Sequence, residues 1–274
     1  MKKRSPIDPA DGLPVAEVGE WSVELKHRFL REYVDATWGA RAKYSNHGYV
    51  DLFSGPGRVK VKTTGQIMDG SPLVAWRTSH KSKAPYTSTI IADVDRDSVD
   101  ACETRLKTAG CLPQKLIGEA WKTARDACAH LDKFGLHLVF LDPFNLEALP
   151  FSVFDAFFEH DLRHVDFIVH FSANDLQRNL DSFLADETSV MDAFAPGWRD
   201  HVTMRARDQM RGTAFWYWVS LFEKHKFKIA KEAPLIRGGT NQPLYWLVLL
   251  SRHRLAADIW NSVADKSPQG KFSF

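Results

Sequence analysis

Acidic residues follow several apolar segments in the first half of the chain. Asp51 lies at the end of the segment GYVD, Asp93 follows TIIA, and Asp142 follows LHLVFL, while Glu119 comes just after KLI. Any one of these acids has an ordinary interpretation as a solvated loop residue or a helix N-cap. The carboxyl ends of parallel strands, however, share one edge of a sheet, and ligands bind there. Four acids at successive strand ends therefore predict one shared ligand-binding edge.

A turn rich in small residues follows Asp51. Its sequence is Ser54-Gly55-Pro56-Gly57, and glycines permit positive φ and a close approach of the backbone to a ligand. A phosphate-binding P-loop is excluded because GxxxxGK[ST] is absent. A dinucleotide fingerprint fits poorly, because Lys60 stands where its third glycine belongs.

The remaining nucleotide interpretation is a site for S-adenosylmethionine (SAM). In such a site the glycine turn packs against the methionine part of SAM. A carboxylate after the second strand binds the ribose hydroxyls, and an acid after the third strand meets the adenine amino group. Asp51 with the glycines, then Asp93, then Glu119 supply these parts in order along the chain. The turn alone is equally consistent with a simple tight turn.

The segment after the glycine turn predicts a small hairpin and then a helix. Residues 58–70 alternate around Thr64-Gly65. Ser71 suits a helix N-cap and Pro72 the first helical position. The same helix N-terminus would favour a ligand carboxylate, so Ser71 is also a candidate ligand contact.

Apolar segments typical of strands alternate with segments of helical periodicity along the chain. This alternation predicts an α/β fold with a seven-stranded mostly parallel sheet and helices on both faces. Residues 1–19 are expected to form an N-terminal arm, and residues 20–274 one domain with an N-terminal helical cap. The expected strands are 49–53, 89–92, 115–117, 136–141, 165–171, 227–230 and 245–250. The expected helices are 22–38, 72–78, 98–109, 121–134, 150–160, 213–224 and 255–264.

Composition limits the class of protein. The 274 residues carry 36 basic and 34 acidic side chains, so nucleic-acid binding would need a local basic patch. The basic start is not followed by an apolar run, and no segment is long enough to cross a membrane. Three cysteines without a CxxC pair predict neither a disulfide framework nor a zinc site. We expect no metal and a cytoplasmic protein.

Seven segments, in order, resemble the three-Cys-motif partner protein (TcmP) family. They are WSVELKHRFLREYV, YVDLFSGPGR, GSPLVA, IIADVD, VFLDPF, NDLQRNL and LYWLVLLSRH with a later IW. The resemblance implies the Rossmann-like fold of a class I SAM-dependent methyltransferase. It also implies a possible protein partner with a three-cysteine motif, because the family name refers to a genomic partner.

The segment Asp142-Pro143-Phe144 is the predicted catalytic loop. It is similar to the DPPY and NPPY loops of amino-methyltransferases, and to the DPFG loop of tRNA guanine-N2 dimethyltransferases. An exocyclic amine is a poor nucleophile, and the Asp142 carboxylate with a backbone carbonyl held by Pro143 would bind its hydrogens. Phe144 would stack on a flat substrate. The alternative is that Asp142 caps a loop and Phe144 lies in the core.

The remaining site residues are predicted with alternatives. The substrate-binding candidates are Lys26, Asn174 and Arg178; Lys26 is equally consistent with a surface lysine, and Arg178 with an ion pair to Asp175 or Asp181. A basic stretch over residues 199–211 favours a solvated face over a nucleic-acid surface. The cofactor-binding set is Asp51, Phe53, Ser54, Gly55, Pro56, Gly57, Ser71, Asp93, Val94, Glu119 and Ala120.

The sequence therefore predicts SAM-dependent methylation of an amine, in a nucleobase or nucleic acid. Two alternatives remain open. One is a non-catalytic partner subunit that binds SAM, a nucleic acid or a protein. The other is an enzyme that uses SAM, or another nucleotide, for a different transfer in the same cleft.

Overall fold

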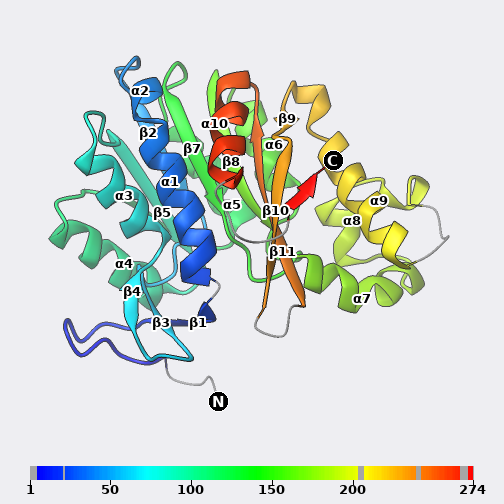
Figure 1. Ribbon diagram of the computed structural model, residues 1–274, viewed down its shortest axis with the longest axis horizontal. Helices are drawn as coiled ribbons and strands as arrows, with labels where there is room; N and C mark the ends of the chain where they lie inside the picture. Colours follow the sequence, from blue (N-terminus) through cyan, green and yellow to red (C-terminus); the bar gives the residue numbers. More distant parts are fainter. Residues whose placement is uncertain (1–4, 21, 203–206, 239–241, 266–270, 274) are drawn as a thin grey trace.

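A computed structural model describes residues 5–20, 22–202, 207–238, 242–265 and 271–273 (Figure 1). Its main feature is a nine-stranded sheet with the order β12-β10-β11-β8-β7-β2-β5-β6, in which β9 also pairs with β11. The strands are β2 His47–Asp51, β5 Ser88–Asp93, β6 Gln114–Ile117, β7 Leu136–Leu141, β8 His164–Phe171, β9 Lys228–Ile229, β10 Glu232–Arg237, β11 Pro243–Ser251 and β12 Lys271–Ser273.

The central part of this sheet is parallel. Strands β6, β5, β2, β7 and β8 run in one direction, and β11 pairs antiparallel with β8. The apolar strands are buried on both sides, since both faces carry helices. The predicted α/β class is confirmed, whereas the predicted count of seven strands was wrong. Sequence reasoning missed β10 and β12, and it made the short β9 two residues too long.

Strand β2 marks the point where the chain changes direction across the sheet. From β2 the chain proceeds to β5 and β6 on one side, and then returns to β7 on the other side. In open α/β sheets, a crevice opens at the carboxyl ends of the strands at such a switch point. The ends of β2 and β7, which carry Asp51 and Asp142, therefore border the expected ligand crevice.

Helices cover both faces of the sheet (Figure 1). One face carries α1, α3 and α10 over a core that includes Tyr49, Phe140 and Leu247, with α4 beside α3. The other face carries α5, α6 and the helices α7 to α9 over an aromatic core. The helices are α1 Arg28–Ala36, α2 Trp38–Arg41, α3 Ser71–Lys81, α4 Arg96–Thr108, α5 Ala120–Ala129, α6 Ser152–Glu159, α7 Ala173–Ala185, α8 Val190–Phe194, α9 Arg207–Ser220 and α10 Arg254–Asp265.

The first helical segment differs from its prediction. It was expected as one helix over 22–38, but it consists of a π-helical segment, Ser22–His27, followed by α1 and then α2. Thr37 ends α1, and its hydroxyl donates to the Tyr33 carbonyl oxygen at 2.7 Å. A π-helical turn at the start of a helix is rare and often occurs at functional sites. Here the turn contains Lys26.

Residues near the N-terminus pack against the glycine-turn region. Strand β1, Ala16–Val18, pairs with β3, Arg58–Val61, which pairs with β4, Ile67–Asp69. The hairpin predicted over 58–70 is therefore confirmed. Two ion pairs anchor the residues before β1: Asp8 contacts Arg58 at 2.7 Å, and Asp11 contacts Arg105 at 2.8 Å.

Within the described residues, no helix is long and apolar enough to cross a membrane. The same residues contain no cluster of His, Cys, Asp or Glu that could hold a metal ion. The three cysteines are buried and form no disulfide.

Candidate functional site

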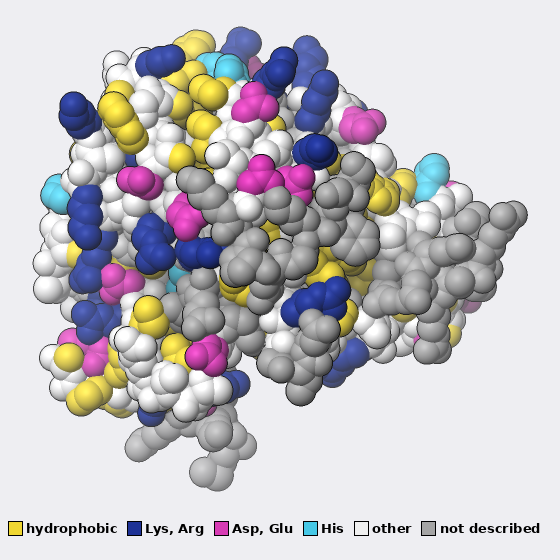
Figure 2. Space-filling view, in the orientation of Figure 1, with side chains coloured by type: hydrophobic (Ala, Val, Ile, Leu, Met, Phe, Trp, Pro, Cys, Tyr) yellow, Lys and Arg dark blue, Asp and Glu magenta, His cyan; other side chains and the backbone are white. Residues whose placement is uncertain are grey.

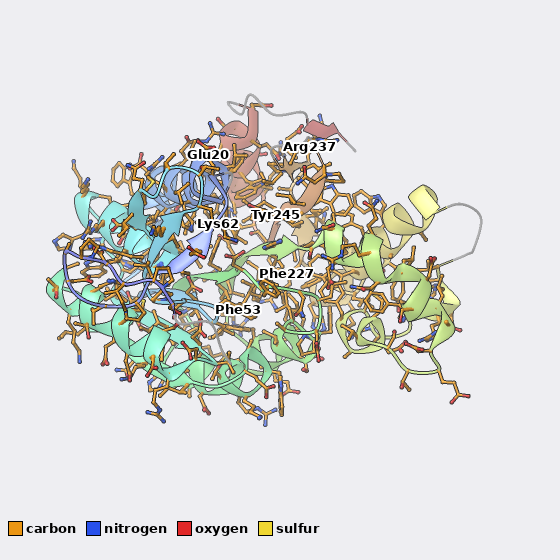
Figure 3. The ribbon with its side chains drawn as sticks, turned by 90° about the horizontal axis from the view of Figure 1, so that it is seen from below. Glu20, Phe53, Lys62, Phe227, Arg237 and Tyr245 are labelled. Atoms are coloured by element: carbon orange, nitrogen blue, oxygen red, sulfur yellow. The ribbon has the colours of Figure 1, made fainter. Side chains whose placement is uncertain are left out.

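The predicted site residues gather at the carboxyl edge of the parallel strands. This edge faces downward in Figure 1, and Figure 3 shows it from below. In that view Phe53, from the turn after β2, and Tyr245, from β11, both lie toward the middle of the molecule. Lys62, which follows β3, lies to the left of Tyr245 and below Glu20 in this view.

The glycine turn adopts the backbone that its sequence predicts. Gly55 has φ of 53° and Gly57 has φ of 78°, both in the left-handed region that favours glycine. A Cβ on Gly57 would lie 3.1 Å from the Cα of Cys102 in α4. A Cβ on Gly55 would meet no atom within 4 Å, so that glycine borders open space. Gly57 therefore packs the turn against α4, and Gly55 leaves room beside it.

Asp51 stabilises the start of the glycine turn through hydrogen bonds. Its side chain is fully buried and accepts hydrogen bonds from the Tyr49 hydroxyl at 3.0 Å and from the Phe53 backbone N–H at 3.1 Å. Burial raises the pKa of Asp51 to about 7, against the effect of these hydrogen bonds and one from Ser71. Because no part of Asp51 is exposed, its role in binding would be to shape the turn.

Ser71 does not cap α3 as its sequence position suggested. Gly70 is the N-cap, Ser71 is the first helical residue, and Pro72 follows it. A hydrogen bond from Ser71 instead lowers the pKa of Asp51. The N-cap prediction for Ser71 was wrong because the helix begins one residue earlier than expected, which places Ser71 inside the helix and its hydroxyl against the Asp51 carboxylate.

Asp93 joins two elements that the sequence had identified separately. Its Oδ2 accepts from the Gly55 backbone N–H at 2.9 Å, and its Oδ1 accepts from the Asp95 backbone N–H at 2.9 Å. Burial raises the pKa of Asp93, while these hydrogen bonds oppose the rise. Each carboxylate oxygen keeps a further lone pair, so Asp93 can accept hydrogen bonds from a ligand while it holds the glycine turn.

Exposed apolar side chains lie beside Asp93. Val94 is 69% exposed, and Ile117, whose strand position pairs with Asp93, is 38% exposed. Trp121 at the start of α5 is 49% exposed, next to the buried Ala120. Glu119 is also exposed, and its side chain pairs with Lys122 at 2.8 Å. This edge therefore offers apolar surface on which a flat ring could pack.

Asp142 lies in a cluster of charged and polar side chains. Its Oδ2 forms an ion pair with Lys26 Nζ, and its Oδ1 is 2.7 Å from His170 Nδ1. The side chains of Lys26, His170 and Asp142 are only 8%, 12% and 17% exposed. Strand register explains the contact with His170: Leu141 pairs with Val169, so the residues that follow them are neighbours. Lys26 is therefore a buried ion-pair partner, and its alternative as a surface lysine was wrong.

This cluster fixes the charge on Asp142. Burial alone would raise the pKa of Asp142, but the Lys26 ammonium and the His170 hydrogen bond hold it well below its usual range. Burial lowers the pKa of His170, although Asp142 works in the opposite direction. At neutral pH the carboxylate is therefore ionised and the imidazole neutral, and the hydrogen on Nδ1 must point to the carboxylate.

The other two residues of the predicted catalytic loop, Pro143 and Phe144, differ in exposure. Pro143 is buried, whereas Phe144 is 95% exposed. Asp175 in α7 accepts from the Leu146 backbone N–H at 2.9 Å, which ties the loop to that helix. The alternative that Phe144 is a core residue was therefore wrong.

The substrate candidates after β8 lie on α7, which sequence reasoning had not assigned as a helix. Asn174 is half-buried in its first turn, and Arg178 is exposed. Asp175 bonds to Leu146 and to Asn179 instead of pairing with Arg178. Arg178 makes no ion pair within the described part of the chain.

The basic stretch is only partly described. Arg199 forms a double contact with Asp192, at 2.9 Å to each carboxylate oxygen. Arg205 lies outside the described residues, as do the side chains of Arg207 and Arg211. On the face shown in Figure 2, Lys and Arg side chains are spread among acidic and hydrophobic ones and form no continuous band.

A cavity of about 400 Å³ lies at the opposite edge of the sheet. Its lining includes Leu136 and His164, the first residues of β7 and β8, and Tyr33 and Ile259 from α1 and α10. It is therefore separate from the predicted site.

No family model matches the sequence, and no curated protein matches it. The resemblance to the TcmP family thus stays a prediction. Solved structures share the fold. Protein LPL1258 from Legionella pneumophila, described with the family model DUF519, has a TM-score of 0.52 and 10% identity, over 87% of this chain and 90% of that chain.

Two further similar structures are those of methyltransferases. The O-methyltransferase from Bacillus cereus, in complex with S-adenosylhomocysteine (SAH), has a TM-score of 0.48 and 13% identity over 88% of this chain and 86% of that chain. The O-methyltransferase TomG from Streptomyces achromogenes, in complex with SAM, has a TM-score of 0.44 and 12% identity over 82% and 78%.

His170 is the residue that sequence reasoning missed. The available signal was a histidine inside the apolar strand segment DFIVHF, next to the loop-forming end of a sheet. Its partner Asp142 is 28 positions away in the sequence, and Lys26 is 116 positions from Asp142.

Proposed function

We propose that this chain is a SAM-dependent methyltransferase that binds SAM across the carboxyl ends of β2, β5 and β6. The observation that carries the proposal is the pair of hydrogen bonds on Asp93, which fixes a carboxylate at the end of β5 to the Gly55 N–H. A turn with open space beside it and an acid with spare lone pairs are thereby held as one unit. Such a carboxylate would accept hydrogen bonds from the ribose hydroxyls of SAM.

The surroundings of Asp93 fit the remaining parts of SAM. Val94, Ile117 and Trp121 would cover the faces of an adenine ring, and this would remove their exposed apolar surface from water. The strand order, with antiparallel β11 between β8 and β10, supports the class I methyltransferase type. SAM supplies an activated methyl group, and the protein supplies binding, orientation and electrostatics.

The methyl acceptor is proposed to be a flat molecule or part of one. Phe144 extends from the loop after β7 with 95% of its surface exposed, and aromatic side chains in such positions bind flat rings by stacking. The sequence favoured an amine of a nucleobase or nucleic acid, with Asp142 as acceptor for its hydrogens. In that case the Pro143-supported backbone and the remaining lone pairs of Asp142 would bind the amine, because Lys26 and His170 already occupy both carboxylate oxygens.

A hydroxyl acceptor is a second candidate, and the hydrogen bond between Asp142 and His170 favours it. A hydroxyl must lose its proton as it is methylated, and a neutral imidazole held by a carboxylate is suited to take that proton.

Calorimetric titration with SAM, SAH, NAD and ATP tests the proposed cofactor. We expect binding of SAM and SAH in the micromolar range and no comparable binding of NAD or ATP. Preference for NAD or ATP would refute the proposal. Binding of SAM without methyl transfer to RNA, DNA or protein would favour the alternative of a non-catalytic partner subunit.

A further inference from the structure

A buried ion pair adjoins a histidine at the carboxyl edge of the sheet. Lys26, Asp142 and His170 come from three elements, the π-helical segment Ser22–His27, the end of β7 and the penultimate residue of β8. Removing an ammonium and a carboxylate from water is costly, and such pairs contribute little net stability compared with apolar residues. Their placement at a ligand crevice, with shifted pKa values, is typical of functional sites.

The contact between Asp142 and His170 determines which nitrogen carries the hydrogen. An ionised carboxylate only accepts, so Nδ1 must donate across the 2.7 Å contact. Nε2 is then the acceptor nitrogen of a neutral ring, and it makes no hydrogen bond within the described residues. The ring of Tyr245 lies 3.8 Å from the imidazole centre and restricts its rotation. The imidazole is therefore held with one free lone pair.

We propose that His170 is the general base of the methyl transfer and that its acceptor is a hydroxyl on or beside a flat ring. This inference rests on the proposed function. As the acceptor oxygen attacks the methyl carbon, an O–C bond forms and the C–S bond breaks, with its electron pair remaining on sulfur to give SAH. The hydroxyl proton passes to Nε2 of His170 and later leaves to solvent. Asp142 and Lys26 are positioning residues for this step.

Lys26 lowers the basicity of the His170 imidazole. The carboxylate raises the basicity of the imidazole, and the ammonium reduces that effect. The charged groups that act on the imidazole are Asp142, which follows β7, and Lys26 from the π-helical segment, and the ring of Tyr245 from β11 packs beside it. His27 and Asp51 act on Asp142. Burial lowers the pKa of His27 to about 3 and raises that of Tyr245 well above its usual range, so neither changes charge near neutral pH. Asp51, whose pKa burial raises to about 7, does change charge near neutral pH, so Asp51→Asn is the background in which the pH response of His170, Asp142 and Lys26 is read.

The ring's protonation can be measured without a known acceptor. Histidine labelled with ¹⁵N gives ring-nitrogen signals for each tautomer, and His170→Gln identifies the signals of residue 170. We expect a neutral ring with the hydrogen on Nδ1 near neutral pH. Lys26→Met should raise the ring's pKa, and Asp142→Asn should lower it and abolish the tautomer preference. A doubly protonated ring near neutral pH, or one with its hydrogen on Nε2, would overturn the proposal even if a variant fails to fold.

Transfer of a tritiated methyl group to total RNA and to catechol distinguishes a catalytic from a structural role. Removing a general base lowers a rate by about 100-fold or more, so His170→Gln should lose that much O-methylation. It should bind SAM as tightly as the wild type in calorimetry. The dependence of its methylation rate on pH should no longer show the rise that accompanies deprotonation of the imidazole. If His170→Gln methylates a base amine in RNA at the wild-type rate, the inference is overturned. Failure of the wild type to bind SAM would instead refute the proposed function and would leave the NMR result standing.

Discussion

Replacing Lys26 by Met should destabilise the fold in a pH-dependent way. The change removes the counter-ion of Asp142, whose side chain is 17% exposed, while His170 continues to donate to it. Breaking a buried pair costs about 3–5 kcal/mol, and partial exposure with one remaining hydrogen bond places this case near the lower limit. For a domain of this size, a loss of about 3 kcal/mol corresponds to a fall in Tm of roughly 6–12 °C.

The sign of the pH dependence follows from Asp142. Its pKa is lowered in the folded protein, so its contribution to stability is present above the unfolded value of about 3.9 and disappears as pH falls toward the folded pKa. Without Lys26, burial dominates and the carboxyl takes up a proton at higher pH. The difference in Tm between wild type and Lys26→Met should therefore be largest near neutral pH and shrink on acidification.

Thermal unfolding followed by calorimetry checks this prediction, with the exposed Lys43→Met as the matched control. Lys43→Met should change stability by less than about 0.5 kcal/mol. The combination of Lys26→Met with Asp142→Asn should cost less than the sum of the single changes, because neither charge is then left alone. Additive effects, or a Tm for Lys26→Met equal to that of Lys43→Met at neutral pH, would refute the reasoning.

Two further predictions concern the glycine turn. Gly57→Ala combines strain at positive φ with a Cβ 3.1 Å from Cys102 Cα, and should cost about 2–4 kcal/mol, whereas Gly55→Ala, in open space, should cost only about 1–2 kcal/mol. Equal losses in denaturant unfolding would contradict the close packing of Gly57 on α4. Asp51 has a folded pKa raised to about 7, so its effect is loss of stability as pH rises from the unfolded pKa of about 3.9 to about 7. Asp51→Asn should lack this loss, and its stability relative to wild type should increase over that range. Parallel stability curves for the two proteins would show that the pKa of Asp51 is not raised.

Local sequence patterns were sufficient to predict most of the central sheet. The apolar segments that became β5, β7 and β8 are largely buried strands, and their composition reflects helices on both faces. The positive φ of Gly55 and Gly57 likewise follows from residue type and turn position. These features depend on neighbours within a few residues, which a sequence displays directly.

Features that depend on tertiary contacts were missed or misassigned. Strand β10 contains Pro234, a residue that disfavours strand interiors, and the strand nevertheless forms because it pairs with both β11 and β12. Ser71 was assigned to a helix end because its buried partner Asp51 is distant in sequence. Helix α7 had a readable pattern in Leu176, Leu180 and Phe183, and it was overlooked.

The cluster of Lys26, Asp142 and His170 illustrates the same limit. Asp142 was predicted from its strand end, but its partners depend on the register of β7 with β8 and on a π-helical segment. No local pattern relates these positions.

The measurement that tests the central claim most directly is the SAM affinity of Asp93→Asn beside the control Asp97→Asn. The control substitution, Asp97→Asn, makes the same chemical change at an exposed position in the first turn of α4. Losing two hydrogen bonds to a charged acceptor, at about 1.5 kcal/mol each, should weaken SAM binding by roughly 100-fold in Asp93→Asn. Asp97→Asn should bind as the wild type does. Equal, undiminished SAM binding by both variants, or no SAM binding by the wild type, would contradict the proposed cofactor site.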